Sequence, residues 1–201
     1  GHFEYDTSGW ATYADAAGVL PVDGTGGSPS VTLTRNTTSP LRGIADGQLN
    51  KGTSNLQGEG WSYDFSVPSI DRGKRVGISF DLDFTDADYG YGDVRCYVYD
   101  VTNAALITPL VTHIPNMKGT FGTAFDSVAT SGSYRLILHV ATTNATALTL
   151  KTDTFKLFSN ITGGGAVQSP PQTFTPVWLA GTMGAADVAN LTREGEFLLL
   201  E

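Results

Sequence analysis

Large apolar residues recur at every second position over much of the chain, which is the period of a half-buried β-strand. Over residues 76–85, four large apolar side chains share one face, and Ser79, Asp81 and Asp83 share the other. A shift of one residue in register would exchange the two faces, so the pattern makes a definite prediction about burial. The residues expected in the core are Ile78, Phe80, Leu82, Val94, Cys96, Val98, Leu136 and Leu138.

The same alternation predicts eight or nine strands in total. The strong ones cover 61–67, 76–85, 94–99 and 134–140, and weaker ones cover 3–5, 31–35, 41–50, 120–129 and 147–157. Turns rich in Gly and Asp, such as 23–29 and 86–93, connect them. This number of strands is typical of a jelly roll or a similar two-sheet sandwich, so we expect an all-β, jelly-roll β-sandwich.

A glycine run at 163–165, followed by Pro170 and Pro171, has the composition of a linker. It divides the chain into a jelly-roll domain (1–160), a linker (161–172) and a segment (173–201) that begins a second β-domain or serves in oligomerisation. That segment ends in an apolar run, Phe197–Leu200, which is costly to leave in water. We expect other chains or a continuation of the protein to cover it, and a trimer would suit a fibre.

Composition excludes several classes of function. No continuous apolar run approaches the length of a membrane span, so membrane insertion is not expected. The net charge of −8 argues against nucleic-acid binding, which requires clustered basic residues. A single cysteine, Cys96, excludes an intrachain disulfide, so stability must come from packing, oligomerisation or a metal.

Residues suited to catalysis are few. The three histidines lack metalloprotease spacing, and neither a nucleophile elbow nor a phosphate-binding loop is present. Cys96 falls on the apolar side of its strand, where a small buried hydrophobe is expected. Asp81 and Asp83 are of the residue type that glycosidases use, but their place on one strand face favours solvated sheet surface. We therefore expect no enzyme.

The polar faces of three strands form the candidate site. If these strands are neighbours, their outward side chains combine into one patch. Tyrosine offers flat stacking surfaces, and Arg and Asp offer directional hydrogen bonds, which suits a sugar-binding face and equally a polar protein interface. An ordinary half-wet sheet with cross-strand pairs is the third interpretation. The patch would contain Asp81, Asp83, Arg95, Tyr97, Tyr99, Arg135 and His139.

The two ends of the first domain resemble those of carbohydrate-binding-module jelly rolls. The matching residues are Gly1-His2-Phe3-Glu4-Tyr5-Asp6 with Gly9-Trp10, and Lys151-Thr152-Asp153-Thr154-Phe155-Lys156-Leu157. Such modules often carry a structural calcium between these regions, so the resemblance implies Ca²⁺ held by Glu4 and Asp153. This sequence departs from the pattern at Thr154, where an Asn is common.

A second resemblance covers most of residues 8–158. Strings such as Gly9-Trp10-Ala11-Thr12-Tyr13 and Ser133-Tyr134-Arg135-Leu136-Ile137-Leu138-His139 are similar to a module of tailed-bacteriophage tail-fibre and virion proteins. The resemblance implies a structural component of the virion, either a tail fibre or a capsid decoration subunit, exposed on the particle. Its implied partners are other virion proteins, further copies of itself, and a host-surface glycan to which it attaches.

Two alternatives to the virion protein remain. The chain could be a carbohydrate-binding module of a secreted bacterial polysaccharide-degrading enzyme. It could also be a glycan depolymerase, which requires a carboxylate pair in a groove that the sequence does not reveal.

Overall fold

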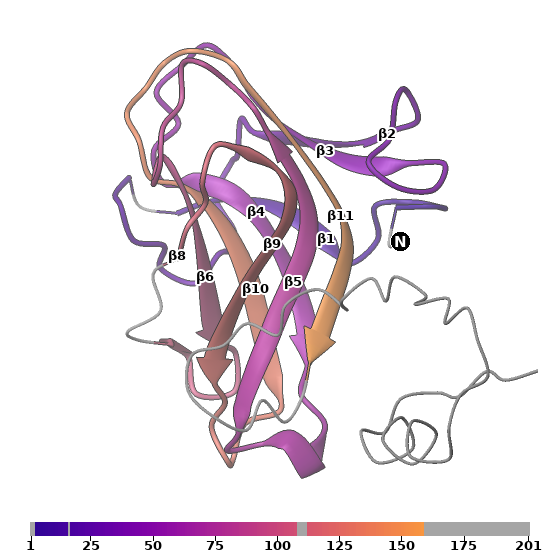
Figure 1. The fold of residues 1–201 in the computed structure, drawn as a ribbon. Coiled ribbons are helices and arrows are strands. Elements are labelled where there is room, and N and C mark those ends of the chain that lie inside the picture. The colour runs from indigo at the N-terminus through magenta and orange to yellow at the C-terminus, as the bar shows by residue number, and fades with distance from the viewer. Residues whose placement is uncertain (1–2, 16, 108–111, 159–201) are drawn as a thin grey trace, which may run out of the picture. The chain divides into compact units, whose positions relative to one another are not determined.

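The computed structural model describes residues 3–15, 17–107 and 112–158, and this part of the chain forms a β-sandwich. It contains eleven strands in two antiparallel sheets and one short 3-10 helix, η1 (Ser69–Asp71) (Figure 1). Two of the strands have only two residues each, which accounts for the excess over the eight or nine predicted. No helix in the described ranges has the length and apolarity needed to cross a membrane.

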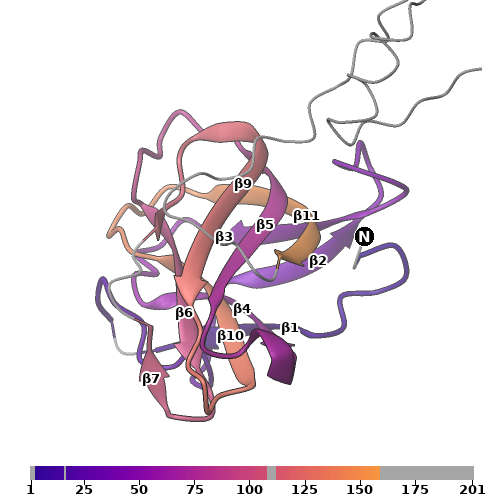
Figure 2. The same cartoon turned by 60° about the horizontal axis from the view of Figure 1, so that its bottom comes forward.

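In both sheets, one of the last two long strands lies in the middle. Sheet A has the order β1 (Trp10–Ala14), β4 (Glu59–Ser66), β10 (Ser133–Val140), β6 (Val94–Asp100) and β7 (Ala105–Leu106), and β8 (Thr112–His113) also pairs with β6. Sheet B has the order β2 (Thr32–Asn36), β3 (Asp46–Lys51), β11 (Leu148–Phe158), β5 (Arg75–Phe84) and β9 (Met117–Asp126). Figure 2 shows β9 beside β5, at one end of sheet B.

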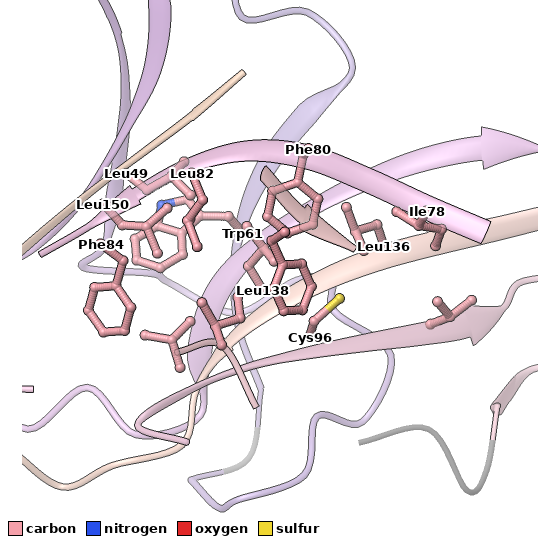
Figure 3. Close-up of a cluster of buried hydrophobic side chains, with 14 of the residues drawn as sticks. Leu49, Trp61, Ile78, Phe80, Leu82, Phe84, Cys96, Leu136, Leu138 and Leu150 are labelled. Atoms are coloured by element: carbon pink, nitrogen blue, oxygen red, sulfur yellow. The ribbon is translucent and has the colours of Figure 1, made fainter. Parts of the chain in front are cut away.

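The core between the sheets confirms the alternation. All eight residues predicted to lie inside are between 0% and 1% exposed, and Figure 3 shows several of them meeting between the strands. Trp61 in β4 lies among them, and its indole N–H donates to the carbonyl of Thr32 in β2 at 2.9 Å. This bond joins β4 of sheet A to β2 at the edge of sheet B.

At the N-terminal end of the domain, the alternation of apolar and polar residues predicts the wrong strand. The prediction of a strand over 3–5 is wrong, because these residues form a turn whose Phe3 ring packs closely against Gly47 of β3. Strand β1 is not predicted, because the large Tyr13 ring points away from the core and breaks the apolar pattern. The linker and the segment 173–201 lie outside the described residues.

Candidate functional site

The seven residues predicted to form one patch lie on two different sheets, so the prediction of a single patch is wrong. Asp81 and Asp83 belong to β5 in sheet B, whereas the other five belong to β6 and β10 in sheet A. Alternation shows which side of a strand faces outward, but it carries no information about the sheet to which the strand belongs. The five in sheet A are neighbours, since β6 and β10 pair directly.

On sheet B, Asp81 and Asp83 are each held in an ion pair with a basic side chain. Asp81 lies 2.9 Å from the Arg42 guanidinium and accepts a hydrogen bond of 2.6 Å from Thr120. Burial favours a higher pKa for the Asp81 carboxyl, but these hydrogen bonds bring the pKa below its ordinary value of 3.8. Asp83 lies 2.8 Å from the Lys118 ammonium. Both carboxylates therefore already have basic partners: Arg42, from the loop between β2 and β3, pairs with Asp81, and Lys118 of β9 pairs with Asp83, as on an ordinary polar sheet surface.

The outer face of sheet A is crossed by residues 17–25, which we call the strap. The strap offers backbone carbonyls to side chains of the predicted patch, and this fixes it across β10 and β6. The bonds run from Tyr97 to Val19 (2.9 Å), from His139 to Gly18 (3.0 Å) and from Arg135 to Asp23 (2.9 Å).

The strap keeps its shape through a carboxylate and a glycine. Asp15 accepts hydrogen bonds from the backbone N–H groups of Val22 and Gly24, at 2.8 and 3.1 Å. Gly24 has a φ of +72°, and a Cβ there would lie 2.7 Å from the Ile137 side chain of β10. Only glycine allows the backbone to come this close to the sheet in this conformation.

Beneath the strap, Tyr13 and His139 form a buried pair with a hydrogen bond of 2.7 Å. The His139 Nε2 atom faces the Gly18 carbonyl, which can only accept, so Nε2 carries the proton and Nδ1 accepts from the Tyr13 hydroxyl. Burial lowers the pKa of His139 below its ordinary value of 6.5. His139 is completely buried and Tyr97 is 2% exposed, so neither is open to a ligand, contrary to the prediction.

Three predicted residues remain at the surface of sheet A. The Arg135 guanidinium is already engaged, since it binds both carboxylate oxygens of Asp64 at 2.6 and 3.0 Å. Arg95 and Tyr99 are half-buried on β6, on either side of Tyr97 and the strap residue that Tyr97 binds. Among the predicted residues, Arg95 and Tyr99 are therefore the ones best placed to meet a ligand.

The structure adds two residues beside Arg95 that the sequence pattern does not single out. Tyr91 is 72% exposed, and its ring lies 4.9 Å from the His113 ring at 78°. His113 pairs with Arg95, whose Nε donates to the Gly92 carbonyl at 3.0 Å. We call Tyr91, Arg95 and His113 the β6 corner.

A sequence signal for the β6 corner exists, but it is ambiguous. Tyr89 and Tyr91 both lie in the glycine-rich turn 86–93, and an aromatic residue in such a turn is either a core residue or a surface residue. Tyr89 is buried beside Phe84, whereas Tyr91 is exposed. The pattern of the turn does not distinguish the two.

The two predicted calcium ligands, Glu4 and Asp153, lie close enough for their charges to interact. Asp153 is 1% exposed, and its Oδ2 has no hydrogen-bond partner among the described residues. Burial raises the pKa of the Asp153 carboxyl above 3.8, and the carboxylates of Glu4 and Asp46 raise it further. Asp46 is satisfied by Asn36 and by the N–H of Leu41.

A buried carboxylate oxygen without a partner fits a cation, because burial of an unpaired charge is costly. Next to it, Thr154 has a φ of 55°, which is strained for a β-branched residue. Glu4 brings a second carboxylate, whose Oε2 also accepts from the N–H of Ile44 at 3.0 Å. No group of three His, Cys, Asp or Glu side chains in the described ranges could hold a metal, so a cation here would also need backbone oxygens.

Nucleophilic chemistry at the cysteine has no support in the geometry. Cys96 is completely buried between the sheets, and burial raises the pKa of its thiol to about 12. The reactive form of cysteine is the thiolate, and an enclosed thiol with this pKa does not ionise near neutral pH.

Comparison with known proteins identifies the fold. No family model matches the chain, and no curated protein matches it in sequence. Among solved structures, one titled "CBM4 structure and function" is 15% identical, with a TM-score of 0.49, and the match covers 79% of this chain and 99% of that one. The enzymatically active domain of bacteriophage CBA120 tailspike protein 4 is 11% identical, with a TM-score of 0.51.

Matches to larger proteins cover only a part of them. The match covers 20% of the tailspike chain and 26% of the Clostridium thermocellum xylanase 10B structure with xylohexaose, which is 12% identical at a TM-score of 0.48. Likeness at such identities concerns the fold alone. Two antiparallel sheets with the strand order given above, together with the likeness to the tailspike domain, show that the described residues between 3 and 158 form a jelly-roll β-sandwich.

Proposed function

We propose that the chain is a non-catalytic carbohydrate-binding module whose ligand site is the β6 corner. The observation that carries this proposal is the exposed Tyr91 ring, which contacts the His113 ring, and His113 pairs with Arg95 of β6. Saccharide-binding sites typically combine an exposed aromatic ring with hydrogen-bonding groups that point toward the same ligand.

Each member of the β6 corner has a distinct part in the proposed site. The Tyr91 ring offers a flat apolar face against which the C–H groups of a sugar ring can pack. Arg95 uses Nε for the Gly92 carbonyl, and its other N–H groups make no hydrogen bond within the part of the chain that the structure describes. Those groups are free to donate to sugar hydroxyls. The contact with His113 restrains the Tyr91 ring, which reduces the conformational entropy lost on binding.

A glycan array followed by calorimetry with the full chain tests the proposal. The array should include xylan, cellulose fragments and bacterial surface polysaccharides. Tyr91→Ala and Arg95→Gln should each weaken binding of the selected glycan by at least about tenfold, which corresponds to 1.4 kcal/mol. Tyr5→Ala is the matched control, because Tyr5 is 92% exposed outside the corner and its loss should leave affinity unchanged. Absence of binding across the array, or equal loss with Tyr5→Ala, would contradict the proposal.

The wider setting is a separate proposal. A secreted bacterial enzyme would use such a module to hold its polysaccharide, and neighbours titled as xylan-binding domains make this the first setting to test. A virion fibre or decoration protein would use it to attach to a host glycan. The tailspike neighbour is compatible with that setting. Detection of the chain in purified phage particles by mass spectrometry would support the virion protein. Its absence from the particles would favour the module of a secreted enzyme.

A further inference from the structure

Sheet B ends in an edge strand that is far longer than the other sheet edges. Strand β9 has ten residues, whereas β1 and β2 have five each and β7 and β8 have two each. Within the part of the chain that the structure describes, no strand pairs with the side of β9 that faces away from β5 (Figure 2). Long open edges are templates for pairing with another strand, and proteins commonly shorten or cover them.

The register of β9 identifies its open backbone groups. Ser127 donates its N–H to the Lys74 carbonyl at 2.9 Å, and the pairing of β5 with β9 then continues without a shift. In an antiparallel ladder, successive residues point their backbone groups alternately toward and away from the neighbour. The even-numbered residues therefore direct their N–H and C=O groups outward. They are Lys118, Thr120, Gly122, Ala124 and Asp126, and all except Ala124 are exposed.

We propose that β9 is a dimerisation edge, which pairs antiparallel with β9 of a second copy about a two-fold axis at Gly122. In this register Gly122 opposes itself, Thr120 opposes Ala124, and Lys118 opposes Asp126 of the second copy. All five outward-facing residues find partners at once, because the set is symmetric about Gly122. A strand that complements itself in this way satisfies the requirement of a closed two-fold interface.

Charge complementarity favours a second copy over an unrelated peptide. Within one chain, Lys118 pairs with Asp83 at 2.8 Å, and Asp126 pairs with Arg75 at 3.4 Å. Placing Lys118 beside Asp126 of the second copy would extend these pairs into one row: Asp83, Lys118, then Asp126 and Arg75 of the second copy. The signs alternate along the whole row. A parallel arrangement would place Lys118 against its own equivalent, where like charges destabilise.

A cysteine scan of the full chain tests the register directly. At the axis, the two copies of residue 122 would have Cα atoms about 5.5 Å apart, within disulfide range. Gly122→Cys should therefore form a disulfide dimer under mild oxidation. Thr120→Cys alone should crosslink at least about fivefold less in the same experiment, since its opposite residue is 124. A mixture of Thr120→Cys and Ala124→Cys chains should crosslink well. The native Cys96 is buried and does not interfere.

Sedimentation equilibrium of the uncrosslinked chain supplies the second measurement. Gly122→Pro removes an outward N–H but no bond to β5, and the Gly122 backbone does not adopt the left-handed conformation that proline cannot reach, so the fold should survive. The dimer should dissociate at least about tenfold more readily in Gly122→Pro, because one donor is lost from each copy. Gly122→Ser keeps the N–H and should dimerise normally. A monomeric wild-type chain, equal crosslinking at 120 and 122, or a dimer unaffected by proline would each overturn the proposal.

Discussion

Tyr13 and His139 lie 126 residues apart in the sequence, yet they share a hydrogen bond of 2.7 Å beneath the strap. Tyr13→Phe should remove the donor to the buried His139 Nδ1 and leave that atom unsatisfied. We expect a loss of about 1–3 kcal/mol in the free energy of unfolding. Urea denaturation measures it, and Tyr5→Phe, which changes an exposed tyrosine, should have no effect. Equal stability of the two variants would contradict the assignment of Nδ1 as an acceptor.

The stability of the domain should depend on the protonation of His139. Its folded-state pKa is lowered, chiefly by burial, so the unfolded chain takes up a proton that the folded chain resists. Stability should therefore be full above the unfolded-state pKa of about 6.5 and should fall as the pH drops from there through the folded-state pKa. Urea titrations between pH 8 and pH 5 measure this slope. In His139→Gln the slope should be smaller, and an unchanged slope would assign the effect to other groups.

The strap should be sensitive to a side chain at Gly24. Gly24→Ala would combine an unfavourable positive φ with a Cβ that lies 2.7 Å from Ile137. Gly26→Ala is a matched control, because Gly26 has a φ of +73° but no heavy atom within 4 Å of the added Cβ. We expect Gly26→Ala to cost about 1 kcal/mol in free energy of unfolding and Gly24→Ala clearly more. Similar costs in thermal melts would show that the strap moves aside freely.

Calcium should stabilise the folded chain if Asp153 and Glu4 bind it. At a hundredfold excess over Kd, a single site adds about 2.7 kcal/mol to the free energy of unfolding, and EDTA should reverse the gain. Asp153→Asn should abolish the response to calcium, whereas Asp88→Asn, in an exposed loop, should retain it. In EDTA, Asp153→Asn should not be less stable than wild type, since it removes an unpaired buried charge. Identical melts with calcium and EDTA would refute the site.

The burial of individual side chains could be predicted from the sequence, because alternation within one strand is a local property. Ile78, Cys96 and Leu138 are buried as the pattern requires. The partnership of strands is not local. A single patch containing Asp81 and Arg95 requires their strands to be neighbours, but the two strands belong to opposite sheets. Turn lengths and alternation contain no information that would distinguish these arrangements.

The alternation of apolar and polar residues also does not predict which outward-facing side chains are accessible to a ligand. Tyr97 and His139 do point outward from sheet A, but the strap covers them. The strap comes from residues 17–25, which have no regular periodicity, so the sequence gives no sign of where they pack. Tyr91 shows the converse problem, because a turn residue becomes part of the candidate site only through its contact with His113.

The position of the last strands has a consequence for how the chain folds. Strand β11 lies between β3 and β5, and β10 lies between β4 and β6 (Figure 1). Sheet A lacks its middle strand until β10 is made, and sheet B lacks its own until β11 is made, so during synthesis the first 132 residues emerge as separate strand pairs with open edges. Such intermediates are slow to complete and prone to associate wrongly. A ribosome-bound chain that stops before Ser133 should therefore remain protease-sensitive, and resistance should arise in a single step once Phe158 has left the exit tunnel.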